Sequence, residues 1–203
     1  MILPANEIAQ RLKDGAEGNE DPLVITPSPD LNALAKSGSG SIDLRLGTWF
    51  ASLRPSTTTV LDVFEDIGKN SRVRLTKESY IPFGKPFILH PRNFVLAVTL
   101  EWIRLPKDLA AYVVGKSSWG RRGLIIATAT GIHPSFTGCL TLELANVGEL
   151  PIAVYPGMQI CQLFLHQMTS VNPETEASGF VAFGRPILGS LEPDTTAKRL
   201  RQG

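Results

Sequence analysis

The sequence predicts a mostly β fold that begins with a short helix. Fifteen prolines and eighteen glycines lie between short apolar runs in a chain of 203 residues, which favours many turns and short strands. Several of these runs alternate apolar and polar residues, and the segment 41–50 (SIDLRLGTWF) does so over most of its length. Alternation with a period of two is typical of strands that bury one face.

The length and composition restrict the class of protein. A chain of 203 residues supports one sizeable core, so a single domain over residues 1–203 is expected. The net charge of +1 does not favour binding to nucleic acid or to an anionic membrane. No apolar run reaches the length of a membrane span, and the residues around Pro4 and Glu7 are unlike a signal peptide. We therefore expect a cytoplasmic protein in which Cys139 and Cys161 are free, buried thiols.

The N-terminal region predicts two helical segments separated by a strand. Residues 4–14 are expected to form a helix, because Ile8 and Leu12 lie one turn apart and would share a face. A short strand is predicted at 23–26, and one more helical turn within 29–40.

The rest of the chain predicts a series of strands joined by turns. Residues 155–158 (YPGM) fit a type II turn, with proline second and glycine third. Residues 51–79 are predicted to form a hairpin excursion. Residues 170–203 are predicted to form a C-terminal lid or tail, of which 192–203 is frayed and basic. The predicted strands cover residues 41–50, 87–89, 94–103, 110–114, 139–145, 151–155 and 158–168.

One carboxylate in the predicted strand 139–145 is a candidate for chemistry. Leucines occupy alternate positions of this strand and fill one face, whereas the other face carries small residues and Glu143. A lone carboxylate among small residues has room for a ligand beside it, and such a group can transfer protons. A buried ion pair of Glu143 is the alternative, because structural pairs also place carboxylates in strands.

A polar loop precedes that strand and suits a polyphosphate. The residues that follow Gly115 bring cations and hydroxyls close together: Lys116, Ser117, Ser118, Arg121 and Arg122. Phosphate oxygens need many donors at once, and such a loop offers them. A P-loop is not indicated, because Ala111 stands where its first glycine would be. The surrounding residues also look like strand, not like a strand that feeds a helix.

Two other chemistries lack their sequence signatures. No histidine is followed two residues later by glutamate, and no Cys-x-x-Cys occurs, so a zinc site is not predicted. No Gly-x-Ser-x-Gly marks a hydrolase nucleophile. Ser117 and Ser118 therefore look like anion ligands and not like nucleophiles.

Several separated motifs together resemble one known family. They are SIDLRLG, FILHPRNFVLAVTLEWIRLP, GKSSWGRRGL and TGCLTLELANVGELPIAVYPGMQICQL, which span about residues 41–164 in the expected order. The chain resembles the dCTP deaminase family of the dUTPase-like superfamily. The resemblance implies a distorted β-barrel or jelly-roll and a homotrimer with sites between subunits. It also implies zinc-independent hydrolysis of dCTP to dUTP and ammonia, with Mg²⁺ bound through the triphosphate and not by protein side chains.

The resemblance also assigns roles to individual residues. Glu143 matches the general base, which takes a proton from the water that attacks C4 of cytosine and returns it toward the leaving ammonia. Arg121 matches an arginine near the catalytic water and the phosphates, and Ser117 belongs to the same catalytic group. Phe136 matches an aromatic residue against the sugar, and Gln159 lies near the base and a subunit contact. The implied nucleotide-binding residues are Lys116, Ser117, Ser118, Arg121, His133, Phe136, Gln159 and Arg185.

Some positions depart from the family pattern. His133 replaces an aspartate that would accept a hydrogen bond from the sugar 3′-hydroxyl, so a pH-sensitive affinity near neutrality is predicted if it contacts ligand. Lys116 replaces an arginine, which keeps the charge and loses the bidentate geometry. The segment 123–131 is shorter than the common form and lacks its usual histidine. In the segment 179–190, which faintly resembles the family's lid, Arg185 is the candidate phosphate ligand.

Two further functions stay open beside the deaminase. One is a dUTP diphosphatase, or a bifunctional deaminase and diphosphatase. The other is a non-catalytic nucleotide-binding regulatory relative that has lost turnover. Release of pyrophosphate would indicate the first, and binding without turnover would indicate the second.

Overall fold

The structure is a computed structural model that describes residues 1–53, 75–128, 131–171, 184–188 and 194–201. The helices are α1 (Ala5–Ala16), α2 (Leu31–Lys36), α4 (Ser117–Gly120) and α5 (Thr195–Arg201). The strands are β1 (Val24–Thr26), β2 (Ile42–Leu53), β3 (Thr76–Tyr80), β4 (Phe87–Leu89), β5 (Phe94–Arg104), β6 (Leu109–Gly115), β7 (Leu124–Ile126), β8 (Gly131–Ile132), β9 (Thr137–Asn146), β10 (Ile152–Val154) and β11 (Gln159–Gln167). None of the described helices is long and apolar enough to cross a membrane.

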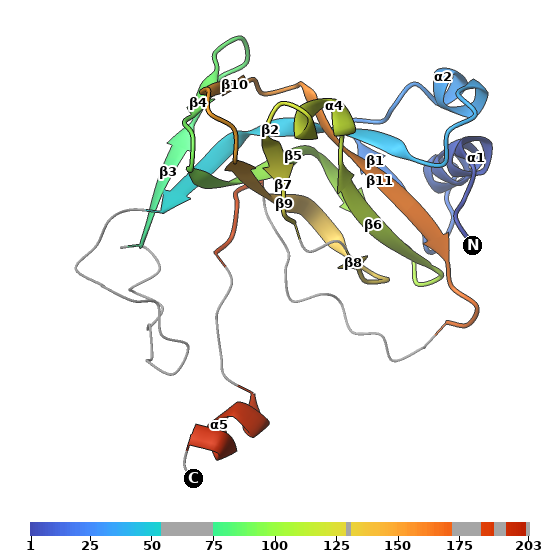
Figure 1. The fold of residues 1–203 in the computed structure, drawn as a ribbon. Helices are drawn as coiled ribbons and strands as arrows, with labels where there is room; N and C mark the ends of the chain where they lie inside the picture. Colours follow the sequence, from blue (N-terminus) through green and yellow to red (C-terminus); the bar gives the residue numbers. More distant parts are fainter. Residues whose placement is uncertain (54–74, 129–130, 172–183, 189–193, 202–203) are drawn as a thin grey trace.

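Nine of the strands form one antiparallel sheet that rolls up on itself (Figure 1). Its order is β7-β9-β5-β2-β11-β6-β8, with β1 added to β5 and β3 added to β2. The first strand of this order, β7, approaches β6, the last strand but one, because a Cβ on Gly115 of β6 would lie 3.4 Å from the side chain of Ile126 in β7. β4 and β10 form a separate two-stranded ribbon. The predicted mostly β, distorted barrel is therefore confirmed.

Apolar residues at alternate strand positions fill the interior of the rolled sheet. In β9, Leu142 and Leu144 are fully buried, whereas Thr141 and Glu143 are half-buried on the other face. The predicted alternation of this strand is therefore confirmed. Cys161 is free and buried as predicted, as is Cys139, and burial raises the pKa of the Cys161 thiol to about 12.

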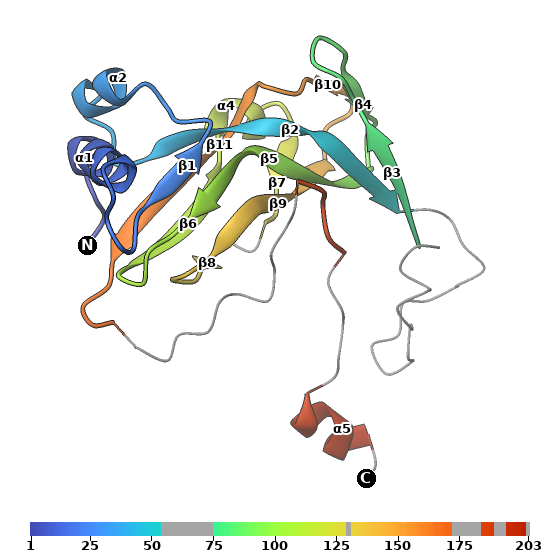
Figure 2. The ribbon, with the colours of Figure 1, turned by 180° about the vertical axis from the view of Figure 1, so that it is seen from behind.

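The N-terminal helix covers one end of the sheet, beside α2 (Figure 2). Ile8 and Leu12 are buried, as their spacing predicts, and the helix extends slightly beyond the predicted end. The backbone before it is joined to β11, since the Leu3 amide donates to Leu165 O at 2.9 Å. The predicted short strand before α2 corresponds to β1, and the predicted extra helical turn corresponds to α2.

Two local predictions are wrong. Strand β6 does feed a helix, because one helical turn, α4, follows Lys116, and the Arg121 amide donates to Ser117 O at 3.0 Å. The basic end of the chain is also helical where we expected a frayed tail. The Asp194 carboxylate accepts from the Ala197 amide at 2.7 Å and caps the start of α5.

The turn and hairpin predictions have different outcomes. Gly157 has φ of +89° and the Met158 amide donates to Tyr155 O at 3.2 Å, as expected for a type II turn. β2 and β3 pair antiparallel up to Leu53 and Thr76, in agreement with a hairpin, but residues 54–74 lie outside the described residues. Of the predicted lid or tail, residues 172–183 also lie outside them.

Candidate active site

Glu143 lies near the middle of β9, between β5 and β7. Its amide donates to Thr128 Oγ1 at 3.1 Å, and its carbonyl accepts from the Ala127 amide at 2.9 Å. These bonds fix the backbone of the residue and leave the carboxylate free to serve another partner. Within the described ranges, the half-buried carboxylate makes no hydrogen bond or ion pair. The buried ion pair that the sequence left open therefore has no partner there.

Part of the C-terminal segment lies along the face of β9 that carries Glu143. The Ile187 amide donates to Thr141 Oγ1 at 3.5 Å, and Thr141 shares a face with Glu143. The backbone of Gly184 also contacts the Cys139 thiol on this face. The segment 184–188 thus passes along the face of β9 that carries the candidate base, at the level of Cys139 and Thr141.

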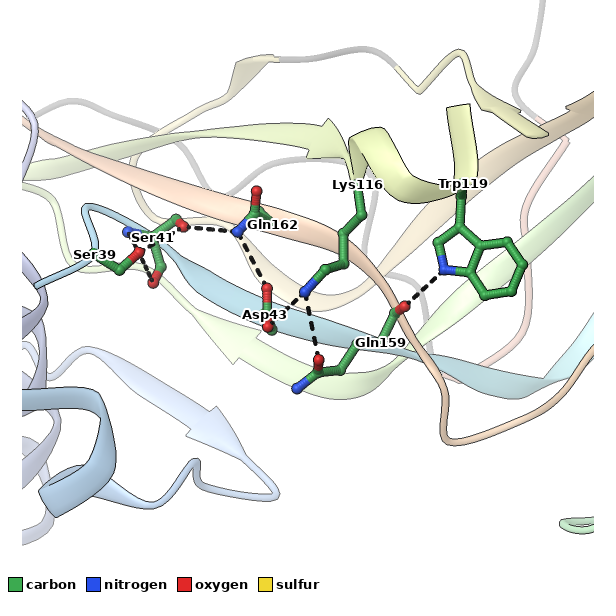
Figure 3. Close-up of polar contacts among 7 residues, drawn as sticks. All are labelled: Ser39, Ser41, Asp43, Lys116, Trp119, Gln159 and Gln162. Carbon is green, nitrogen blue, oxygen red and sulfur yellow. Dashed lines mark hydrogen bonds and ion pairs between the residues drawn. The ribbon is translucent and has the colours of Figure 1, made fainter. Parts of the chain in front are cut away.

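The predicted phosphate loop begins where β6 ends beside β11. The Lys116 amide donates to Ile160 O at 3.2 Å, which holds the backbone of Lys116 against β11. Its side chain donates from Nζ to Asp43 Oδ2 at 2.7 Å and to Gln159 Oε1 at 3.4 Å (Figure 3). Trp119 in α4 donates from Nε1 to the Gln159 carbonyl at 3.2 Å. Lys116 and Gln159, both candidate ligands, therefore lie together.

The hydroxyls and the arginine of the loop face solvent. Ser117, Ser118 and Arg121 are exposed, and all three belong to or directly follow the single turn of α4. The neighbouring Arg122 donates from Nη1 to the Ser118 carbonyl at 2.7 Å, which ties the loop into a compact turn. The loop therefore presents hydroxyls and cationic groups to an anion that approaches from outside.

The two sugar-side candidates lie in the turn between β8 and β9. His133 is exposed, whereas Phe136 is 7% exposed and belongs to the hydrophobic core. Ser135 between them has φ of +64°, in the left-handed region that favours glycine, and its hydroxyl has no partner in the described structure. The predicted contact of Phe136 with a sugar could use only the small part of its ring that is exposed.

Arg185 has partners of its own within the chain. Its guanidinium lies 4.1 Å from the centre of the Trp49 ring, and Nη1 donates to Glu78 Oε2 at 3.1 Å. The predicted phosphate ligand of the tail is thus paired with a carboxylate on β3.

The sheet keeps three candidates apart within one subunit. Ile126 of β7 and Leu144 of β9 are cross-strand partners, so their side chains share one face of the sheet. Gly115 lies against that same face. Glu143 points to the other side of this layer, because neighbouring side chains of a strand alternate. His133 follows the Ile132–Ala111 pair, so it lies near the other end of β6 from Lys116. At about 3.3 Å per residue, roughly 20 Å of strand separates the levels of positions 110 and 116.

Sequence reasoning missed two carboxylates near these residues. Asp43 binds Lys116, and Glu101 of β5 is buried, with its side chain 2% exposed. Arg45 donates to Glu101 Oε2 from its amide at 2.8 Å and to Oε1 from Nη1 at 3.1 Å. Burial raises the pKa of Glu101, although the hydrogen bonds and charge of Arg45 act in the opposite direction. Glu101 alternates in phase with Val95, Ala97 and Ile103, but the other phase of β5 is apolar as well, so the sequence alone did not show that Glu101 is buried.

The rolled antiparallel sheet, with a carboxylate unpaired among the described residues on one side of its β7–β9 layer and a polar loop after β6 on the other, is a dUTPase-like β fold. Its fold resembles the crystal structure of 2'-deoxycytidine 5'-triphosphate deaminase from Agrobacterium tumefaciens, with a TM-score of 0.59 and 23% identity. The match covers 82% of this chain and 48% of that one, so this chain spans about half its length.

The chain belongs to the dCTP deaminase-like family, whose model matches residues 2–168. It is 40% identical over 171 residues to a protein of Dictyoglomus thermophilum named "dCTP deaminase, dUMP-forming", which covers 84% of this chain and 82% of the relative. A protein of Corynebacterium efficiens with the same name is 39% identical over 196 residues, covering 95% of this chain and 92% of the relative. The chain is therefore an enzyme, a dCTP deaminase-like hydrolase.

Proposed function

We propose that this enzyme deaminates the cytosine of dCTP and releases dUMP, with Glu143 as the general base. The observation that carries the proposal is the Glu143 carboxylate, half-buried on β9 and without a partner among the described residues. The relatives reported above are named as dUMP-forming, which supports the bifunctional alternative over our first expectation of dUTP as the product.

The proposed reaction consumes two waters and yields ammonia, pyrophosphate and dUMP. In the first step, Glu143 takes a proton from one water, whose oxygen bonds to C4 of cytosine. The proton then passes to the amino nitrogen, the C4–N bond breaks and ammonia leaves, while the proton that remains on the new hydroxyl moves to N3 and the uracil carbonyl forms. In the second step, the other water hydrolyses the bond between the α- and β-phosphates and pyrophosphate leaves.

We assign the triphosphate to the loop that follows β6. Lys116 Nζ, the exposed hydroxyls of Ser117 and Ser118 and the exposed Arg121 offer donors and positive charge to phosphate oxygens. The described residues contain no group of three or more His, Cys, Asp or Glu side chains placed to hold a metal. A Mg²⁺ that arrives on the triphosphate, as the resemblance to the family implies, would neutralise part of the phosphate charge.

We also propose that a site forms between subunits of a homotrimer. The Glu143 carboxylate and Gly115, where the loop begins, face different sides of the β7–β9 layer. His133 lies at the other end of β6 from Lys116. A second copy of the chain that places its loop beside Glu143 would complete a site that one subunit leaves divided.

Product analysis tests the proposed reaction. The purified protein is incubated with dCTP and Mg²⁺, and ammonia, pyrophosphate, dUTP and dUMP are measured separately. We expect ammonia, pyrophosphate and dUMP in equal amounts. Accumulation of dUTP without pyrophosphate would replace the bifunctional reaction by simple deamination. Binding of nucleotide without either product would overturn the enzymatic proposal and leave the regulatory alternative.

Subunit mixing tests the shared site. The variants Glu143→Gln and Lys116→Met are each expected to have little activity. After the two are unfolded together and refolded, mixed trimers would contain sites with an intact loop from one copy and an intact carboxylate from another. Recovery of activity is therefore expected. No recovery, in a sample shown to contain mixed trimers, would contradict a site shared in this way.

A further inference from the structure

We propose that Asp43 is a positioning residue that directs the Lys116 ammonium toward the triphosphate. The inference rests on the proposed function, because it concerns how that site holds its substrate. It starts from the 2.7 Å hydrogen bond from Lys116 Nζ to Asp43 Oδ2.

Lys116 needs a second group to set its direction. A lysine ammonium is a point charge on a flexible four-carbon stem, whereas the planar guanidinium of an arginine is preorganised. The ammonium has three donors, and Asp43 and the Gln159 side chain accept two of them. These two acceptors leave one N–H for a phosphate oxygen and restrict the directions in which it can point.

Asp43 is itself held in place. Gln162 Nε2 donates to Asp43 Oδ1 at 3.2 Å and to Ser41 Oγ at 3.2 Å (Figure 3). Asp43 of β2 and Gln162 of β11 are direct cross-strand partners, so their side chains share a face of the sheet. Asp43 Oδ1 therefore accepts from Gln162 of the sheet, and Oδ2 accepts from Lys116. The sheet thus restricts the position of the ammonium through the carboxylate.

The same geometry distinguishes positioning from simple stabilisation. The side chains of Asp43 and Lys116 are 31% and 25% exposed, and ion pairs near the surface contribute little to stability. A purely stabilising pair would leave substrate affinity unchanged when it is weakened. If the Asp43 carboxylate instead competed with the phosphates for Lys116, removal of its charge would strengthen phosphate binding.

The test compares Asp43→Asn with the wild type by steady-state kinetics on dCTP and by equilibrium binding of dCTP and dCMP. Asparagine keeps the size and loses the charge that orders Lys116. We expect KM and Kd for dCTP to rise about tenfold, the size of one weakened charge-assisted hydrogen bond, with kcat within about twofold. The Kd for dCMP, which lacks the outer phosphates, is expected to change less than about twofold. Unchanged or tighter dCTP binding would overturn the proposal.

A double-mutant cycle shows whether Asp43 acts through Lys116. In the Lys116→Met background, Asp43→Asn is expected to change the Kd for dCTP less than about twofold, because no ammonium remains to be positioned. Equal losses in both backgrounds would overturn the proposal. Gln162→Ala, which frees the other carboxylate oxygen, is expected to weaken dCTP binding in the same direction and by less than Asp43→Asn.

Asp108 offers a matched control. Arg11 Nη1 donates to Asp108 Oδ2 at 2.8 Å, and the two side chains are 29% and 27% exposed, which makes the pair similar in length and exposure. Asp108→Asn is expected to leave the kinetics unchanged, and an equal effect of both variants would overturn the proposal. Failure of the proposed function looks different, because the wild type itself would then not turn over dCTP.

Discussion

Two glutamates in neighbouring strands of this protein have opposite surroundings. Glu101 of β5 is buried, and both its oxygens accept hydrogen bonds from Arg45. Glu143 of β9 is half-buried, and its carboxylate has no partner in the described part of the chain. One glutamate thus has a structural role that its neighbours complete, and the other is available to a ligand.

The phase of each residue within its strand explains the difference. Glu101 shares its face with Val95, Ala97 and Ile103, so the strand turns its carboxylate toward the core. Burial without compensation would be costly, and Arg45 supplies both a backbone amide and a guanidinium. Glu143 is out of phase with the leucines of β9 and so points away from the core. The comparison teaches that phase, not residue type, separates the buried, hydrogen-bonded carboxylate from the one that is left without a partner among the described residues.

The largest effect is expected for Glu143→Gln. Removal of the general base should lower kcat by about 10²- to 10⁴-fold, because glutamine cannot accept the proton of the attacking water. The free energy of unfolding should stay within about 0.5 kcal/mol, since the carboxylate makes no hydrogen bond or ion pair with the described residues. Ammonia release and urea unfolding measure the two quantities. Activity within threefold of the wild type would remove Glu143 from the mechanism.

Glu101→Ala is expected to act on stability. It leaves the Arg45 amide without its acceptor and opens a space in the core, so the free energy of unfolding should fall by about 2–4 kcal/mol. Urea unfolding measures the loss. Glu101→Gln is the control, because it keeps an acceptor for the amide and should lose less. Equal losses for the two variants would show that shape and not hydrogen bonding is decisive at this position.

The pH dependence of stability should report the burial of Glu101. Because burial raises the pKa of Glu101 above its ordinary value of 4.5, the folded state binds this proton more tightly than the unfolded chain does. The resulting stabilisation is present below that ordinary value and is lost as pH rises through the folded-state pKa. The stability of the wild type relative to Glu101→Gln should therefore fall with rising pH. A difference that rises with pH would contradict the assignment.

The smallest effect is expected for Arg185→Ala. The guanidinium contacts Trp49 and Glu78, but the side chains of Arg185 and Glu78 are 58% and 45% exposed, so water screens the ion pair. The free energy of unfolding should fall by about 0.5–1 kcal/mol, mainly through the lost contact with the ring. Thermal unfolding at two salt concentrations measures it. A loss above about 2 kcal/mol would show that Arg185 anchors more of the C-terminal segment than these contacts do.

Local patterns predicted much of the fold and part of the site. The leucine alternation of β9 identified both the buried face and the orientation of Glu143, and Ile8 and Leu12 identified the face of α1. The Pro-Gly pair identified the type II turn at Gly157. These features depend on residues a few positions apart, so the sequence carries them directly.

Contacts between distant segments were not predictable in the same way. Lys116 binds Asp43, which lies 73 positions away, and Arg45 binds Glu101, which lies 56 positions away. The single turn of α4 was also missed, because SSWG is too short to show a helical period. The contact of Arg185 with Trp49 of β2 was not predicted either, whereas its role as a phosphate ligand stays a prediction.

The sequence by itself determined the family, the strand faces and the choice of Glu143 as the candidate base, because motif order and period-two alternation are written along the chain. Only the tertiary structure decided which carboxylate is neutralised by an arginine and which lysine is held by an aspartate. Such pairs depend on the register between strands and on how the sheet rolls. Those are properties of many residues acting together, and no single segment encodes them.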